Sequence, residues 1–220
     1  MMTSLWTAYP LNRSHMGTLA RPDNWCYNPS IDEAYQAKLT SHSYSDNTYS
    51  RGHMCPNGSR NGNYTMQKQT FYVTNQVPQI QNSFNSGIWS NLENAVQGLV
   101  SGNSEEVYVV TGVAFNIVGE NRTVNYVSPA DNSSQRCPIP NYFYKIVLRV
   151  KYNGSTVTSA KTIGFWMEHK AYTNDSYVNY TVSVDQIEKW TGFDFFVNLP
   201  DSIENKVECL NPSWSEFTSF

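Results

Sequence analysis

The pattern of apolar and polar residues predicts a chain built mainly of strands, with a few helices between them. Five segments rich in β-branched and aromatic residues are predicted strands: Leu5–Tyr9, Thr70–Thr74, Val107–Gly112, Tyr142–Tyr152 and Thr162–Met167. Asn153-Gly154 follows the fourth of them, and this dipeptide is typical of a hairpin turn. A further strand is expected at the Ser-Arg-Gly-His segment that ends at His53.

Apolar residues at helical spacing predict two main helices. The first runs from Ile88 to Leu99 and ends before Gly102. The second begins at a capping box formed by Ser183 and Gln186 and is closed by Gly192. Shorter helical segments are expected at Ser30–Ala34, with Ser30 as the cap, and at Ile203–Val207, whereas the stretch rich in Asn, Gln and Ser that ends at Gly87 predicts no regular element. These elements predict an α+β protein, in which helices pack on an antiparallel central sheet, and residues 1–220 are expected to form one domain.

The charge of the chain is unevenly distributed. The net charge is −3, but basic residues outnumber acidic ones before residue 70. The basic residues there are Arg13, Arg21, Lys38, Arg51, Arg60 and Lys68, and the acidic ones are Asp23, Asp32, Glu33 and Asp46. A locally positive site on an acidic chain suits transient, catalytic contact with phosphates better than tight storage of nucleic acid.

Composition also bears on the compartment. No apolar run approaches the roughly 20 residues that span a bilayer, so no membrane partner is expected. The four cysteines, Cys26, Cys55, Cys137 and Cys209, contain no CxxC pair, which argues against a zinc ribbon. Their even number fits an oxidising compartment, whereas buried free thiols are an equal alternative. We expect an extracellular or periplasmic bacterial protein whose native precursor, and whose first strand, extend further back than Met1.

His53 and Arg51 are candidate catalytic residues because they lie two residues apart on a predicted strand. Side chains at this spacing share one face of a strand, which makes the imidazole and the guanidinium neighbours. The guanidinium disfavours the imidazolium, so the ring stays neutral and can accept a proton near pH 7. It can also bind a phosphate oxygen, and Gly52 allows close approach of backbone or substrate. The alternative, an Arg–His pair on a solvated strand, does not explain this glycine.

Asn85 and Glu93 are candidate metal-site residues near the start of the first predicted helix. Glu93 lies one turn beyond Trp89, on the side that can face Asn85 in the preceding loop. An Asn carbonyl is a hard oxygen ligand suited to Mg²⁺, which keeps most of its waters, and a carboxylate behind it can hold one of those waters. The alternative is that Asn85 only shapes the loop and that Glu93 is a surface residue.

Three ordered motifs carry a resemblance to a known family. They are Tyr49-Ser50-Arg51-Gly52-His53-Met54-Cys55-Pro56, then Thr70-Phe71 with Thr74-Asn75 and Pro78-Gln79, then Asn85-x3-Trp89-x2-Leu92-Glu93. Together they resemble the non-specific DNA/RNA endonucleases, the endonuclease-G-like group with a ββα-metal (His-Me finger) site. The segments Val107–Gly112, Pro140–Lys145 and Thr191–Phe196 also resemble this family, so the likeness extends from about Trp6 to about Val207.

The resemblance implies a role for each motif residue. His53 is the general base, Asn85 is the only direct protein ligand of a hydrated Mg²⁺ ion, and Glu93 holds a water on that ion. Arg51 stands at the family's motif arginine, and Mn²⁺ or another divalent ion can substitute for Mg²⁺. The implied activity is hydrolysis of DNA and RNA without sequence preference, giving 5′-phosphate products. The implied partners are the nucleic acid substrates, a second copy in a homodimer and, if the protein is a secreted toxin, an inhibitor protein.

The sequence departs from the family pattern at several positions. Ser50 replaces the usual Asp, Cys55 replaces Ala, and Pro10 and Gln97 stand where many members have Arg. Ser50 is expected to weaken the anchoring of the site, and Arg13 or Arg60 is a candidate to supply the missing charge to the substrate. Asn82 is a rival metal ligand, because the segment before Asn85 is about one residue longer than usual. The alternative function is a degenerate nuclease fold that binds nucleic acid or a protein without cleavage.

Overall fold

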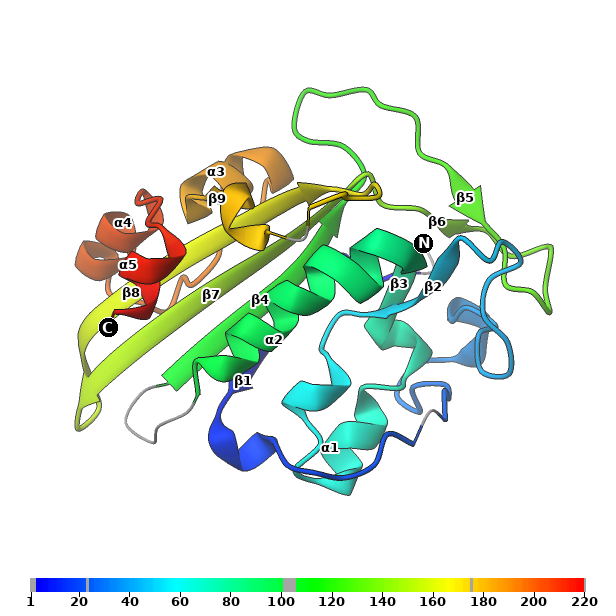
Figure 1. The fold of residues 1–220 in the computed structure, drawn as a ribbon, viewed down its shortest axis with the longest axis horizontal. Coiled ribbons are helices and arrows are strands. Elements are labelled where there is room, and N and C mark those ends of the chain that lie inside the picture. The colour runs from blue at the N-terminus through cyan, green and yellow to red at the C-terminus, as the bar shows by residue number, and fades with distance from the viewer. Residues whose placement is uncertain (1–2, 23, 101–105, 175, 220) are drawn as a thin grey trace.

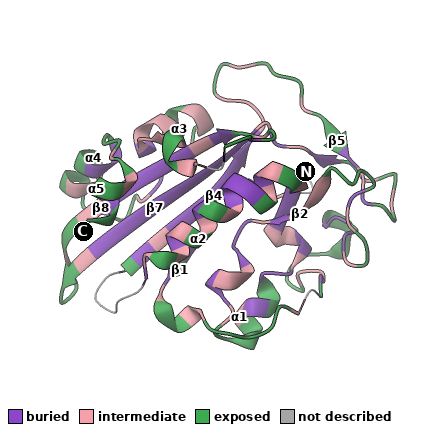
Figure 2. Ribbon diagram, viewed as in Figure 1, coloured by how far each residue is buried: buried purple, intermediate pink, exposed green. Residues whose placement is uncertain are grey.

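The fold is organised around one antiparallel sheet of five strands, in the order β1–β4–β7–β8–β9 (Figure 1). The computed structural model describes residues 3–22, 24–100, 106–174 and 176–219. The strands are β1 (Trp6–Leu11), β4 (Glu106–Ala114), β7 (Tyr142–Asn153), β8 (Thr156–Glu168) and β9 (Thr181–Val182). The two longest strands, β7 and β8, form a hairpin, and Figure 2 shows β4 and β7 as buried almost throughout. Apolar residues on both faces of these strands require cover on both sides of the sheet.

Helices cover both faces of this sheet. The first face packs against α2 (Ser90–Gly98) and α5 (Trp214–Thr218), whose residues share one apolar core with β4 and β7. The second face packs against α3 (Val184–Thr191) and α4 (Asp201–Glu208). The sheet is therefore the middle layer of three.

A smaller unit lies against α2 and contains the sequence motifs. It consists of β2 (Tyr49–His53), paired antiparallel with β3 (Gln76–Ile80), and of α1 (Tyr64–Gln69) between them. An irregular helical segment, Gln81–Trp89, then leads directly into α2. Two strands followed by a helix thus form a ββα unit, and α2 belongs both to this unit and to the main core.

His169 joins this unit to the end of β8. Its Nε2 accepts a hydrogen bond of 2.8 Å from the backbone N–H of Ile80, and its Nδ1 lies 2.9 Å from the carbonyl oxygen of Pro140. These two contacts fix the tautomer, because Nε2 must be the acceptor and Nδ1 the protonated nitrogen. Burial lowers the pKa of His169 to about 4, so the ring is neutral and serves as a structural bridge.

Most predicted strands and helices are confirmed. The segment Leu5–Tyr9 overlaps β1, which begins one residue later, and Val107–Gly112, Tyr142–Tyr152 and Thr162–Met167 lie in β4, β7 and β8. Gly154 occupies the hairpin turn with φ +61°. Ser183 accepts from the N–H of Gln186 at the start of α3, and Gly192 ends that helix with φ +74°. The segment Ile203–Val207 lies in α4.

Three predicted elements differ from the structure. Thr70–Thr74 is not a strand: α1 ends at its start, and the strand comes later, at Gln76–Ile80, in the stretch predicted to be irregular. The first helix ends at Gly98, and the predicted stop at Gly102 lies outside the described residues. Asp32, rather than Ser30, caps the short helix Glu33–Tyr35 through a bond to the N–H of Ala34.

Peripheral features complete the fold. Two short strands, β5 (Tyr126–Val127) and β6 (Cys137–Pro138), pair with each other. All four cysteines are unpaired thiols. Among the described residues, no helix has both the length and the apolar character needed to cross a membrane.

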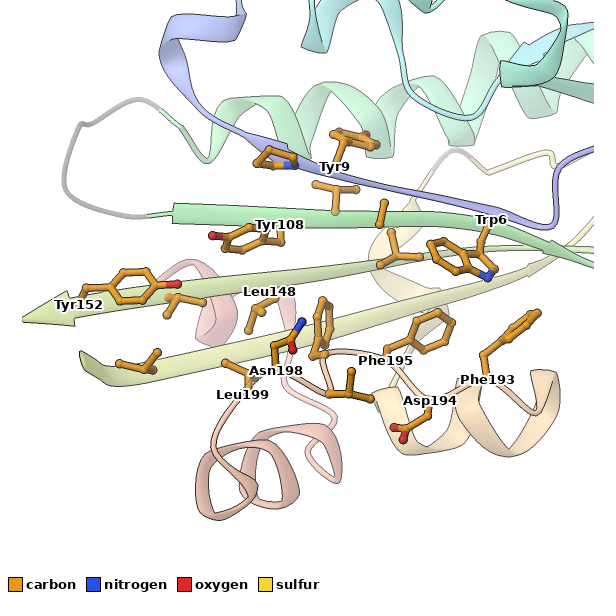
Figure 3. Close-up of a pocket in the computed structure, with 18 residues that line it drawn as sticks. Trp6, Tyr9, Tyr108, Leu148, Tyr152, Phe193, Asp194, Phe195, Asn198 and Leu199 are labelled. Atoms are coloured by element: carbon orange, nitrogen blue, oxygen red, sulfur yellow. The ribbon is translucent and has the colours of Figure 1, made fainter. Parts of the chain in front are cut away.

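On the second face of the sheet, a groove of about 550 Å³ lies between β1, β4 and the segment 193–199, and its walls are mostly apolar (Figure 3).

Candidate active site

The first and third sequence motifs meet in one polar cleft of about 570 Å³, which we call the His53 cleft, and Pro78-Gln79 of the second motif pairs with the β2 strand that lines it. Strand β2 contributes Ser50, Arg51 and His53, and the irregular segment contributes Gln81 and Asn85. Helix α2 presents one face to the cleft, with polar residues at helical spacing: Ser90, Glu93, Asn94 and Gln97. The remaining walls come from loops and include Arg21, Trp25, Ser43 and the segment 56–58.

His53 lies at the end of β2, against two aromatic rings that also contact each other. Its imidazole centroid is 4.8 Å from that of Trp25 and 5.1 Å from that of Phe71. The Nε2 atom is buried and has no hydrogen-bond partner in the described part of the chain. Burial first, and then the charges of Arg21 and Arg51, lower the pKa of His53 to about 3. The ring is therefore neutral at pH 7, and its nitrogen can accept a proton.

The cause of this neutrality differs in part from the sequence-based explanation. Arg51 does act on His53, but burial contributes most and Arg21 contributes more than Arg51. Arg51 lies over the ring of Trp25, with its Cζ 4.9 Å from the centroid, and its Nη1 donates to the carbonyl of Leu39. Trp25 therefore positions both the arginine and the histidine in the cleft.

Gly52 is needed for packing rather than for substrate approach. A Cβ atom at Gly52 would lie 2.2 Å from Oε1 and 2.6 Å from Cβ of Gln79, a buried residue of β3. The close approach predicted from the glycine thus exists, but it is made by Gln79.

Asn85 is held in a fixed orientation. Its Nδ2 donates two hydrogen bonds of 3.0 Å, one to Ser50 Oγ and one to Gln81 Oε1. With both amide hydrogens bound, the carbonyl oxygen, which accepts no hydrogen bond from the described residues, remains as the coordinating atom. Ser50 Oγ in turn donates to the carbonyl of Gln79 at 3.3 Å. Ser50, expected to weaken the site, thus provides one of the two contacts that orient Asn85.

Glu93 faces a buried lysine from the sheet. Lys145 of β7 donates to Thr111 Oγ1, and its Nζ lies 4.8 Å from the ring centroid of Trp89. The net effect of burial is to raise the pKa of Glu93 above its usual range, and the positive charge of Lys145 only partly opposes this rise. This buried pair favours an ionised Glu93 only as long as Lys145 keeps its proton.

Neither arginine expected to supply extra substrate charge lies in the His53 cleft. Arg60 is only 8% exposed, and its guanidinium donates to the carbonyls of Pro10 and Ser59 and lies over the ring of Tyr9. A guanidinium bound to two backbone carbonyls fixes the chain, so the structure assigns Arg60 a structural role. Arg13 lies in an exposed helical turn outside the cleft lining.

The structure also separates the two candidate ligands. Asn82 is exposed and is not among the cleft residues, whereas Asn85 is. Gln97, which stands at a common arginine position of the family, does line the cleft. Its side chain packs closely against Gly58, because a Cβ atom at Gly58 would lie only 2.8 Å from Oε1 of Gln97.

Sequence reasoning did not assign Arg21 or Trp25 to the cleft, nor did it identify the histidine that supports it. Arg21 and Trp25 come from a segment without regular structure that is far from the motifs in the sequence. The only sequence signal for Arg21 was the excess of basic residues before residue 70, and Trp25 had none. His169 follows β8, and no sequence pattern linked it to β3.

The residues present fit a hydrated divalent cation. Asn85 offers a hard carbonyl oxygen with its amide nitrogen already bound, and Glu93 adds a carboxylate in the same cleft. Arg21 and Arg51 supply positive charge for phosphate, and His53 supplies a neutral base. A base, a cation site and arginines in one cleft are groups that can act together in phosphodiester hydrolysis.

Comparison with known proteins identifies the family. The model of the family described as DNA/RNA non-specific endonuclease matches residues 1–202. A "Nuclease" from Nostoc sp. is 28% identical over 210 residues, which cover 94% of this chain and 71% of that protein. "Nuclease EXOG, mitochondrial" from Mus musculus is 29% identical over 182 residues, 82% of this chain but only 48% of that protein.

A solved structure shows the same fold. The crystal structure described as the EndoG/EndoGI complex superposes with a TM-score of 0.78 at 21% identity, over 92% of this chain and 82% of that chain. Because the family model covers most of the chain, and the ββα arrangement predicted from the motifs is present, the protein is a member of the DNA/RNA non-specific endonuclease family.

Proposed function

We propose that the protein is a metal-dependent endonuclease that hydrolyses phosphodiester bonds of DNA and RNA in the His53 cleft. One observation carries the proposal: a neutral imidazole with a free, buried Nε2 shares one cleft with an asparagine whose carbonyl oxygen is free to coordinate. Family membership supports nuclease activity, and the chain spans 71% and 48% of the two relatives described above.

His53 acts as the general base. Its neutral ring accepts a proton from the water molecule that attacks phosphorus. Trp25 and Phe71, which also contact each other, pack against the ring, and burial keeps it neutral between reaction cycles. Arg21 and Arg51 attract the phosphate, and because their charges disfavour the imidazolium, they favour release of the accepted proton from His53 after the attack.

Asn85 and Glu93 hold the metal ion. Asn85 would offer Oδ1 to the ion, and Glu93 would add a carboxylate able to hold one of its waters. The ion, Mg²⁺ or a substitute such as Mn²⁺, supplies positive charge that stabilises the negative charge developing on the phosphate and the leaving oxygen. Ser50 and Gln81 keep Asn85 oriented for this role.

The substrate is recognised through its backbone. The cleft offers guanidinium and amide groups that suit phosphate, so both DNA and RNA are expected substrates, with little sequence preference. Products carrying 5′-phosphate ends are expected, as in the family. The homodimer, the inhibitor protein and the extracellular or periplasmic location remain predictions.

The activity is tested with purified protein, Mg²⁺, supercoiled plasmid and RNA. His53→Ala is expected to lower kcat at least about a hundredfold, the usual contribution of a general base. Asn85→Ala is expected to abolish the response to Mg²⁺, and Asn82→Ala, at the exposed rival position, is the matched control that keeps it.

The same assay separates cleavage from binding alone. A degenerate domain would retain plasmid in a gel-shift experiment and nick nothing, with or without a chelator. Equal cleavage by the wild type and by His53→Ala would contradict the proposed base. Full metal dependence in Asn85→Ala, together with its loss in Asn82→Ala, would transfer the ligand role to Asn82.

A further inference from the structure

Three carboxylates converge on the second face of the sheet, where α3 and α4 lie, away from the α2 side that forms the His53 cleft. Asp185 and Glu188 lie on α3, three residues apart and so on one side of the helix. Glu208 is the last residue of α4. One carboxylate oxygen from each of the three lies within 4.8 Å of the others, although like charges at this distance repel.

Glu208 is the unusual member of this group. It is only 5% exposed, and its Oε1 has no hydrogen-bond partner in the described part of the chain. The charges that act on it most strongly all belong to carboxylates, those of Glu188, Glu204, Asp185 and Asp194. Burial and this repulsion raise its pKa to about 8. A buried carboxylate without a partner is costly unless a cation or a proton compensates it.

The neighbouring groups extend the negative environment. Glu204, one turn before Glu208 on α4, also has a buried oxygen, Oε1, without a partner. Glu188 is fixed by one bond, because the N–H of Phe195 donates to its Oε1 at 2.8 Å. In Figure 3, the carboxylate of Asp194 turns away from the sheet toward the helices, whereas the rings of Phe193 and Phe195 turn toward the sheet.

We propose that Asp185, Glu188 and Glu208 form a calcium site that joins α3 to α4. Calcium binds six to eight oxygens at about 2.3–2.6 Å, so its coordination sphere spans about 5 Å and can include oxygens that lie within 4.8 Å of one another. Magnesium requires a rigid octahedron only about 4 Å across, and is the weaker occupant. Bound calcium supplies the partner that the buried Oε1 of Glu208 lacks.

The site is structural and separate from catalysis. The proposal does not depend on nuclease activity, because none of the three ligands lines the His53 cleft. Its function is to hold the two helices together over the strands they cover.

The test is calcium-dependent thermal unfolding of the 220-residue protein carrying Asn85→Ala, which removes the metal ligand proposed for the His53 cleft. Calcium sites of extracellular modules have dissociation constants of about 0.1–1 mM, so about 10 mM CaCl₂ should raise Tm by roughly 3–10 °C. MgCl₂ at the same concentration should raise it by less than half as much.

Glu208→Gln, made in the same background, keeps the shape of the side chain and removes its charge. It should raise Tm in the absence of calcium, because repulsion is relieved, and should lose most of the calcium response. Asp185→Asn, at a half-buried position, should lose the response as well. Asp201→Asn, which removes one charge from an exposed position of α4, is the matched control and should keep the response.

Two outcomes would overturn the proposal. One is a Tm in the Asn85→Ala protein that calcium does not change. The other is an equal calcium shift in Glu208→Gln, Asp185→Asn and Asp201→Asn, which would indicate a non-specific ionic effect.

Discussion

Ser50 provides a direct test of how the His53 cleft holds its metal ligand. Its Oγ is one of two acceptors for the amide nitrogen of Asn85, and it donates to the carbonyl of Gln79. In Ser50→Ala, one of the two bonds that orient Asn85 is lost, and only Gln81 remains as an acceptor. The change is made behind the ligand, without touching the atom that would coordinate the ion.

The size of the effect follows from the number of bonds lost. One neutral hydrogen bond contributes about 1 kcal/mol net, which corresponds to about a fivefold change in affinity. Groups that orient metal ligands typically change affinity by 10–100-fold when they are removed. We therefore expect the Mg²⁺ concentration for half-maximal activity to rise about 5–30-fold in Ser50→Ala, while kcat at saturating Mg²⁺ stays within about twofold.

Ser50→Asp restores the residue usual in the family and is the companion variant. A carboxylate accepts the Asn85 N–H more strongly than a hydroxyl and adds negative charge near the cation. The half-maximal Mg²⁺ concentration should therefore fall below that of the wild type.

The assay is plasmid nicking followed across a series of Mg²⁺ concentrations, with Asn82→Ala as the variant that should match the wild type. A Ser50→Ala protein with the wild-type Mg²⁺ requirement would refute this account of Asn85. A loss of kcat at every Mg²⁺ concentration would instead show that Ser50 acts on the chemical step.

Three other predictions concern stability, each measured by urea unfolding. Burial lowers the pKa of His53 to about 3 and that of His169 to about 4, from 6.5. Each ring is neutral in the folded protein but gains a proton below pH 6.5 in the unfolded chain, so its contribution to the free energy of unfolding is present above pH 6.5 and is lost as the pH falls. Between pH 7.5 and 5 the loss is about 2 kcal/mol for each histidine. His53→Asn should therefore lose less stability over this interval than the wild type. Gly52→Ala should cost roughly 1–3 kcal/mol, since its Cβ would lie 2.6 Å from Cβ of Gln79; an unchanged midpoint would contradict this. Arg60→Met should cost roughly 2–4 kcal/mol by removing the buried guanidinium that donates to two carbonyls, yet keep the KM for DNA; a raised KM in folded protein would return Arg60 to substrate binding.

Elements with a local pattern were predictable from the sequence. Val107–Gly112 is apolar throughout because β4 is buried on both faces, and α3 has its cap at Ser183 and its stop at Gly192. Strand β3 was not predictable in the same way. Its residues Gln76 and Gln79 are polar but fully buried, and contacts with β2 and His169, rather than β propensity, make this segment a strand.

The site was predictable only as far as its motifs extend. His53, Asn85 and Glu93 were found because they lie in short segments with characteristic spacing, and the structure places all three in one cleft. Arg21 and Trp25 were not assigned to it, because their contacts with His53 and Arg51 join positions 26 to 32 residues apart across irregular chain. Arg60 was misplaced for the converse reason: its charge is visible in the sequence, but its burial is not.

The distribution of charge explains why a net charge of −3 is compatible with a phosphate substrate. Arg21 and Arg51 lie in the His53 cleft on the α2 side of the sheet, whereas the carboxylates of α3 and α4 gather on the other side. A packed helix and a sheet are each about 10 Å thick, and at physiological salt the Debye length is about 8 Å. A phosphate entering the cleft therefore interacts mainly with the two guanidinium groups, and the acidic face, which sets the sign of the total charge, has little effect on it.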